Sequence, residues 1–246
     1  MCHQYFNSPF SLALMKKLVL LHGWGTGSRI WQRQVEAFEG SMEVLAPDIP
    51  GWEPVWVKTY LPRLPLEDCV LVGWSLGGML LLEALADLNA APGALVLVAA
   101  AASFCRRPDH PWGQPAAAVR AMRRGLLKDP GAVVREFALN SQAPQEEAFR
   151  EEVMELFDNQ SSPEHLAAGL DFLLRQDCRT RLGEIQAQAI IVQGEADVIV
   201  PPEQARFLHE HLAGSRLHLF PDAGHLPFLT QAARFNGILK EAFRNS

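Results

Sequence analysis

The chain has 246 residues, of which 48% are hydrophobic and 20% are charged, and its formal net charge is −6. This length and composition are typical of one large globular domain, or of a domain with a substantial insertion. The negative charge argues against a general nucleic-acid-binding protein, so we expect no nucleic-acid partner.

The sequence predicts neither a membrane anchor nor a secretion signal. The uncharged run 69–82 is much shorter than the roughly 20 apolar residues that a membrane helix needs. The basic pair Lys16 and Lys17 follows the apolar N-terminal stretch, the reverse of a signal peptide. We therefore expect a cytoplasmic protein without a membrane partner. Separately, we expect it to be a monomer. Met15 is a candidate start, which would make the residues before it a dispensable extension.

The cysteines predict reduced thiols. Cys2, Cys69, Cys105 and Cys178 are scattered without C-x-x-C spacing, so we expect neither a disulfide framework nor a zinc site.

Short apolar runs of strand length alternate with stretches of helical pattern. The predicted strands are LVLL (18–21), EVLA (43–46), CVLV (69–72), ALVLVAA (94–100), AIIVQ (189–193) and RLHLF (216–220). Continuous apolar runs indicate strands that are covered on both faces. The sequence therefore predicts an α/β fold with a mainly parallel sheet flanked by helices.

The alternation is interrupted once, between the fourth and fifth predicted strands. That stretch holds no convincing strand and is punctuated by prolines, so it predicts a helical cap inserted over the carboxyl edge of the sheet. The expected division is 1–102 for the first part of the core, 103–185 for the cap and 186–246 for the second part of the core.

Charge is segregated within this insertion. Residues 106–135 hold seven Lys or Arg against two Asp, and residues 136–164 hold eight acidic residues against Arg150. One hypothesis is that these are two solvated helix faces that pair with each other. The other is that the basic half is a docking patch for an acidic partner.

The stretch 73–77, GWSLG, matches the G-x-S-x-G pattern between a predicted strand and a predicted helix over 76–88, which is the context of a nucleophile elbow. So tight a turn forces the serine into a strained backbone conformation and requires glycines beside it. The dipole of the following helix favours developing negative charge near the serine hydroxyl. Ser75 is the candidate nucleophile; the alternative is a glycine-rich turn that happens to hold a serine.

A nucleophilic serine needs a base and a carboxylate that orients the base. His225 follows the last predicted strand, from where an imidazole can reach across the strand ends, and is the candidate base. His22 is expected to brace its own loop instead. Asp197, after the penultimate strand, is the candidate acid. Asp222 is the alternative, although its place three residues before the histidine favours a turn residue.

The tetrahedral intermediate of acyl transfer needs two hydrogen-bond donors aimed at its oxyanion. The expected donors are the backbone N–H groups of Leu76, directly after the nucleophile, and of Trp24, in the loop LLHGWGTG. The sequence shows no phosphate-binding glycine loop and no metal-ligand cluster, so we expect neither a cofactor nor a metal.

Four motifs outside the insertion carry a resemblance: LLHGWG (20–25), GWSLGG (73–78), GEADVIVP (194–201) and AGHLPF (223–228). Together they resemble the α/β-hydrolase superfamily. The tryptophans of HGWG and GWSLGG make the chain similar to the pimeloyl-acyl carrier protein methyl ester esterases of biotin synthesis. These enzymes hydrolyse the methyl ester of an acyl chain on its carrier, release methanol and leave the thioester intact. The resemblance implies a triad of Ser75, Asp197 and His225, with oxyanion amides at Trp24 and Leu76.

The same resemblance implies roles in binding. Trp74 would line the acyl channel and Trp24 would lie near the ester, with core packing as the alternative for both. Basic residues of the cap bind the acidic carrier protein in that family, which would suit the basic half of the insertion. The candidate partner-binding residues are Arg106, Arg107, Arg120, Arg123 and Arg124.

The chain departs from the superfamily pattern before the nucleophile. The residues preceding Met15 leave room for one short strand where the superfamily carries a strand pair, so we expect a truncated sheet edge. The short segment 48–69 contains Pro62 and Pro65, which predicts that its usual helix is reduced to a turn or two. A smaller flank there would widen the mouth of the pocket.

The expected protein is therefore a serine carboxylesterase acting on the carrier-bound pimeloyl methyl ester. A general small-ester carboxylesterase is one alternative. A second is a lyase or carbon–carbon bond hydrolase of the menaquinone-pathway type, whose anionic substrate would need basic side chains inside the pocket. A third is a non-catalytic ligand-binding protein, against which the complete set of catalytic positions argues.

Overall fold

A computed structural model describes residues 16–88, 90–157 and 161–245. Its centre is a six-stranded sheet with the order β2-β1-β3-β4-β5-β6, in which every neighbouring pair is parallel. The strands are β1 (Lys17–Leu21), β2 (Glu43–Leu45), β3 (Cys69–Trp74), β4 (Ala94–Val98), β5 (Ala189–Gly194) and β6 (Arg216–Phe220). All six predicted strands are present, so the predicted α/β sheet is confirmed. The short strand considered before Met15 lies outside the described residues.

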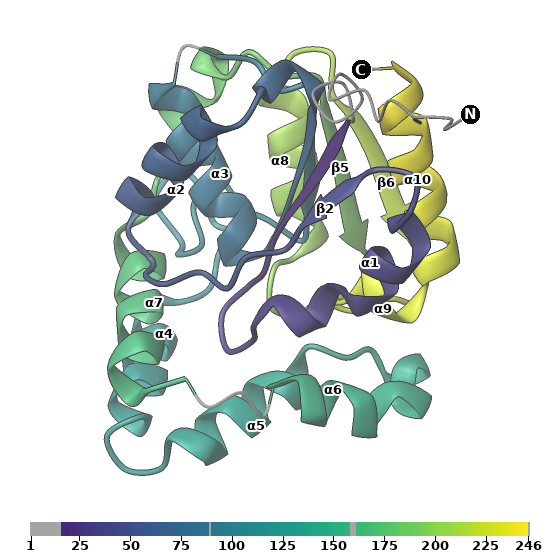
Figure 1. Ribbon diagram of the computed structural model, residues 1–246. Coiled ribbons are helices and arrows are strands. Elements are labelled where there is room, and N and C mark those ends of the chain that lie inside the picture. The colour runs from purple at the N-terminus through teal and green to yellow at the C-terminus, as the bar shows by residue number, and fades with distance from the viewer. Residues whose placement is uncertain (1–15, 89, 158–160, 246) are drawn as a thin grey trace, which may run out of the picture.

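Helices cover both faces of this sheet (Figure 1). One layer contains α2 (Pro54–Tyr60), α3 (Leu76–Asp87) and α8 (Pro202–His211), and the other contains α1 (Gln32–Phe38) and α10 (Ala232–Asn245). Every residue of β3, β4 and β5 is buried between the two layers. This double coverage is the reason that the strands read as continuous apolar runs.

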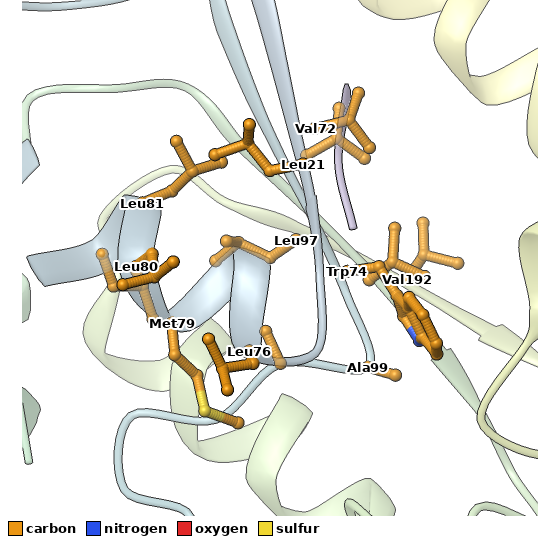
Figure 2. Close-up of a cluster of buried hydrophobic side chains, with 14 of the residues drawn as sticks. Leu21, Val72, Trp74, Leu76, Met79, Leu80, Leu81, Leu97, Ala99 and Val192 are labelled. Atoms are coloured by element: carbon orange, nitrogen blue, oxygen red, sulfur yellow. The ribbon is translucent and has the colours of Figure 1, made fainter. Parts of the chain in front are cut away.

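Helix α3 packs against the centre of the sheet. Its Leu80 and Leu81 are fully buried, and burying each such side chain contributes roughly 1.5–3 kcal/mol. Figure 2 shows Leu81 of α3 and Leu97 of β4 between helix and sheet, whereas the ring of Trp74 points to the other side of the strands. The turn between β3 and α3 is thereby held by two of the most buried elements.

Between β4 and β5 lie four α-helices and, within the described residues, no named strand. They are α4 (Ala116–Gly125), α5 (Pro130–Asn140), α6 (Arg150–Phe157) and α7 (Pro163–Arg175), with the 3-10 helix η5 (Pro144–Phe149) before α6. Helices α4 and α7 pack side by side, and α5 and α6 extend beyond the ends of the strands (Figure 1). These helices thus lie at the carboxyl edge of the sheet.

The segment before β3 is short, as predicted. Helix α2 has seven residues, about two turns, and two short 3-10 helices, η3 (Leu61–Arg63) and η4 (Leu66–Asp68), lead from it to β3. Strand β4 ends at Val98, two residues before the predicted end. The reason is backbone conformation, because Ala99 has a φ of 46° and turns the chain out of the extended region.

The sequence predicts reduced cysteines and no membrane-spanning helix. Among the described helices, none combines the length and the apolar character that crossing a membrane requires. Cys69, Cys105 and Cys178 are buried and free, whereas Cys2 lies outside the described residues.

Candidate active site

Ser75 lies at the turn that joins β3 to α3. Its backbone is left-handed, with a φ of 52° and a ψ of −119°. Holding a non-glycine residue in such a region costs on the order of 1–3 kcal/mol. The Ser75 N–H donates to the carbonyl of Val98 at 2.8 Å, which ties the turn to β4. The strained turn predicted from the motif is therefore present, at the N-terminus of α3.

The glycines around the serine are required by close backbone approach. A Cβ at Gly73 would lie 2.5 Å from the Cα of Gly78, and one at Gly77 would lie 2.4 Å from the carbonyl oxygen of His22. Rotation of a side chain cannot relieve contacts with backbone atoms, so only glycine allows the turn to pack this closely.

Asp197 and His225, which follow β5 and β6, form a buried pair. The Nδ1 of His225 donates to Oδ2 of Asp197 at 2.8 Å, and both side chains are fully buried. Asp222 is exposed and adopts a left-handed backbone, with a φ of 59°, which suits the predicted turn residue. Of the two candidate acids, Asp197 is the one brought to the histidine.

The carboxylate of Asp197 is held by further donors. Its Oδ1 accepts from the backbone N–H groups of Ile199 and Val200 at 2.8 and 2.9 Å. Its Oδ2 also accepts from the side-chain amide of Gln193 at 3.0 Å. Sequence reasoning missed Gln193, although a glutamine near the end of an otherwise apolar strand is a visible signal. These bonds fix the carboxylate in the orientation that reaches His225.

The second ring nitrogen of His225 carries no hydrogen bond from the described part of the chain. Its Nε2 is buried and has no hydrogen-bond partner within the described residues, Ser75 included. In free enzymes the bond between nucleophile and base is often long and tightens only when substrate binds. The described residues His110 and His218 each have a buried ring nitrogen without a partner too, so it is the bond to Asp197 that distinguishes His225.

Both candidate substrate-binding tryptophans are packed in the core. The indole N–H of Trp74 donates to the carbonyl of His225 at 2.8 Å, and its ring centroid lies 5.4 Å from the imidazole. The indole N–H of Trp24 donates to the carbonyl of Leu166 at 2.8 Å. Neither side chain is more than 1% exposed. Trp74 thus steadies the backbone of the histidine, a contact that the sequence did not indicate.

The loop after β1, which holds Trp24 and so one of the two predicted oxyanion amides, is braced by His22. Its Nδ1 donates to the carbonyl of Gly23, and its Nε2 accepts from the N–H of Ile49, both at 2.9 Å. Burial lowers the pKa of His22 to about 4, so the ring is neutral at physiological pH. The backbone N–H groups of Trp24 and Leu76 find no acceptor among the described residues.

A cavity of about 650 Å³ lies between α4, α5 and the loop after β5, within the range typical of ligand pockets. Phe137 lines it, and the Phe137 ring lies edge-on to His225 with 6.2 Å between centroids. Glu136 is the only charged side chain among its lining residues. In the described part of the chain, no three His, Cys, Asp or Glu side chains gather as metal ligands would.

The five candidate partner-binding arginines differ in their surroundings. The Nε of Arg107 lies 3.5 Å from Oδ2 of Asp177, and the Nε of Arg123 lies 2.6 Å from Oδ1 of Asp171. Arg106 donates to the carbonyl of Gly113. Arg120 and Arg124 are exposed, and the side chain of neither forms a hydrogen bond or an ion pair with another described residue.

The acidic half of the insertion is not the partner of the basic half. Between described residues 106–135 and described residues 136–157 and 161–164, no ion pair is formed. Nothing in these segments therefore supports the hypothesis that the two halves neutralise each other.

Comparison with known proteins places this geometry in a family. Residues 18–238 match the model of the alpha/beta hydrolase family. A pimeloyl-[acyl-carrier protein] methyl ester esterase of Aromatoleum aromaticum is 31% identical, over 92% of this chain and 98% of that protein. The enzyme of the same name from Nitrosomonas europaea is 30% identical, over 89% and 92%. An esterase from Exiguobacterium antarcticum has the same fold, with a TM-score of 0.85, 24% identity and coverage of 93% and 92%.

Both relatives from Aromatoleum aromaticum and Nitrosomonas europaea are named esterases, and the match extends over nearly the whole length of each. This confirms the expected class of enzyme, a carboxylic ester hydrolase. The predicted fold, the strained serine turn and the family match agree with one another. The chain belongs to the alpha/beta hydrolase family.

Proposed function

We propose that this chain is a serine esterase with Ser75 as the nucleophile, His225 as the base and Asp197 as the residue that orients the base. The observation that carries the proposal is the buried pair of Asp197 and His225, 2.8 Å apart, at the sheet edge where Ser75 occupies its left-handed turn. A ligand-binding protein has no need of a strained serine beside a buried carboxylate–imidazole pair.

In the proposed reaction, His225 takes a proton from the nucleophile and then gives it to the leaving group. The Ser75 hydroxyl attacks the ester carbonyl carbon while Nε2 of His225 takes its proton. The oxyanion accepts hydrogen bonds from the N–H groups of Trp24 and Leu76. The intermediate collapses to an acyl-enzyme, and His225 gives its proton to the departing alcohol. Water then repeats the two steps and releases the acid.

We propose that residues 103–185 act as a cap and that the acyl chain lies in the 650 Å³ cavity between the cap helices α4 and α5 and the loop after β5. Apolar side chains such as Val119, Met122 and Phe137 line this cavity, and none of its lining residues is Lys or Arg. A methyl ester is uncharged and suits such a lining, whereas an anionic substrate would leave its charge unpaired. The lining therefore favours ester hydrolysis over the lyase alternative.

The proposed substrate is the methyl ester of a pimeloyl chain on acyl carrier protein, as the names of the relatives suggest. Helix α4 supplies part of the cavity wall and also carries the exposed Arg120 and Arg124. An acidic carrier docked on these arginines would stand next to the cavity that takes its acyl chain. Arg107 and Arg123 are expected to contribute less, because each already has an internal acidic partner.

The test compares hydrolysis of the carrier-bound pimeloyl methyl ester with that of a free p-nitrophenyl ester. The variants are Ser75→Ala and the double charge reversal Arg120→Glu/Arg124→Glu. The control is the single charge reversal Arg63→Glu, at an exposed position outside the insertion. We expect Ser75→Ala to lose both activities. The double reversal should raise KM for the carrier-bound ester alone, and the control should change neither activity.

Equal hydrolysis of both esters, insensitive to the charges on α4, would identify a general small-ester carboxylesterase. Retention of both activities in Ser75→Ala would contradict the nucleophile itself.

A further inference from the structure

One acidic residue of the proposed cap is buried although most of its acidic neighbours are exposed. Glu146, in η5, is 4% exposed, whereas the adjacent Glu147 has a side chain that is 75% exposed. Burying a carboxylate is costly unless hydrogen bonds compensate for the lost water. Its partners therefore indicate what holds it in place.

Glu146 accepts three hydrogen bonds, two of them from the chain that flanks His225: one from the loop before it and one from the end of helix α9 (Pro227–Thr230) after it. Its Oε2 accepts from the N–H of Gly224 at 2.9 Å, and its Oε1 accepts from the hydroxyl of Thr230. The third donor is the N–H of Ala143, at 2.7 Å from Oε2, which anchors the carboxylate within its own segment. One cap carboxylate thus binds the chain on both sides of the histidine.

The cap contacts the same loop through its backbone as well. The N–H of His225 donates to the carbonyl of Ser141 at 2.8 Å. A Cβ at Gly224 would lie 2.6 Å from that carbonyl oxygen and 2.7 Å from the nitrogen of Ala143. The loop is packed so closely on residues 141–143 that a movement of this part of the cap would move the histidine too.

We propose that Glu146 is a positioning residue for His225, a cap carboxylate bonded to the backbone N–H of Gly224 before the base and to the hydroxyl of Thr230 after it. The inference rests on the proposed role of His225 in the triad. Asp197 and Trp74 hold the imidazole and the carbonyl of the histidine, and Glu146 holds the N–H of the preceding residue, Gly224. Without Glu146 the buried N–H of Gly224 loses its acceptor, and the loop must shift to find another.

Glutamine is the conservative replacement at this position. Its amide oxygen can accept from both backbone N–H groups, and its NH₂ can donate to the hydroxyl oxygen of Thr230. That hydroxyl can then donate to the carbonyl of Leu226, which lies 3.2 Å away. Alanine provides none of these bonds. Glu146→Gln should therefore retain the geometry that Glu146→Ala loses.

The experiment measures ester hydrolysis by wild type, Glu146→Ala, Glu146→Gln and the exposed control Glu147→Ala. We expect kcat of Glu146→Ala to fall by about 10- to 100-fold with little change in KM, because a displaced base slows chemistry more than binding. Glu146→Gln and Glu147→Ala should remain near wild type. The low-field proton NMR resonance of the His225–Asp197 hydrogen bond should weaken in Glu146→Ala and persist in Glu146→Gln.

Circular dichroism and Tm report whether each variant folds. Should Glu146→Ala fail to fold, Thr230→Val, which removes one of the three bonds, should show a smaller loss of kcat. The proposal is overturned if folded Glu146→Ala keeps its kcat and its low-field resonance, if Glu146→Gln is as impaired as Glu146→Ala, or if Thr230→Val, used in its place, has wild-type kcat. A wild-type protein that hydrolyses no ester, and whose Ser75 does not react with a fluorophosphonate, would instead count against the proposed function.

Discussion

At the residue scale, the buried carboxylate of Asp197 accepts four hydrogen bonds. The donors are Gln193, Ile199, Val200 and His225. Asp197→Asn would keep the size of the side chain but present an NH₂ group to one of these donors. The imidazole of His225 would then turn or change tautomer. We predict a loss of kcat/KM of roughly 10³- to 10⁴-fold in steady-state ester hydrolysis.

The control for that prediction is Asp222→Asn. Asparagine tolerates the left-handed backbone of this exposed turn, so the variant should keep wild-type kcat/KM. If instead Asp222→Asn were the inactive variant and Asp197→Asn retained activity, the assignment of the acid would be reversed.

His22 predicts a pH dependence of stability. Its pKa is about 4 in the folded chain against an ordinary value of 6.5, so between these values the unfolded chain binds a proton that the folded chain rejects. This stabilisation is complete above about pH 6.5 and is lost as the pH falls toward 4. Glutamine at position 22 can still accept from Ile49 but does not titrate.

Urea unfolding at pH 7.5 and pH 5 measures this difference. Wild type should lose about 2 kcal/mol more of its free energy of unfolding on acidification than His22→Gln does. Parallel losses in the two proteins would show that His22 is not held neutral by the fold.

At the element scale, the packing around two helical glycines, Gly77 at the start of α3 and Gly237 in α10, predicts opposite effects on stability. A Cβ at Gly77 would meet the carbonyl oxygens of His22 and Leu21 at 2.4 and 2.6 Å, so Gly77→Ala should lower the free energy of unfolding by more than about 2 kcal/mol. Gly237 lies within α10, where a Cβ would meet nothing within 4 Å. Gly237→Ala should therefore raise it by about 0.5–1 kcal/mol.

Denaturant unfolding of the two glycine variants distinguishes close approach from simple helix propensity. A stabilised Gly77→Ala protein would contradict the described packing between α3 and the loop after β1.

The elements themselves were predictable from the sequence because a doubly covered sheet requires apolar runs, as in β3 and β5. The residues at which the elements end were less predictable. Strand β4 ends where Ala99 turns left-handed, and alanine gives no local signal of such a turn. The turn at Ser75 was predictable because glycines mark the positions of close approach.

The contacts that support the site could not be predicted from the sequence, for a different reason. Glu146 reads as one more acid in an acidic stretch, and only the tertiary fold brings it to Gly224. Trp74 is adjacent to the nucleophile in sequence, yet its bond to the carbonyl of His225 joins positions 151 residues apart. Such long-range pairing depends on topology, which local patterns do not encode.

At the scale of the whole molecule, the buried thiols predict chemical protection. Burial raises the pKa of Cys69 to about 11 and that of Cys178 to about 12, and it also raises the pKa of Cys105. In a Cys2→Ser variant, Ellman's reagent at pH 8 should find no reactive thiol in the native protein and three after denaturation. Rapid reaction of the native variant would mean that the core opens readily.

The measurement that tests the central claim most directly is the intact mass of the protein after brief exposure to a fluorophosphonate, followed by mapping of the modified peptide. A nucleophilic Ser75, activated by His225 and Asp197, predicts one phosphonyl adduct on the peptide that contains Ser75 and none in folded Ser75→Ala. No adduct on folded wild type, or an adduct that persists in Ser75→Ala, would contradict the assignment of this serine as the nucleophile.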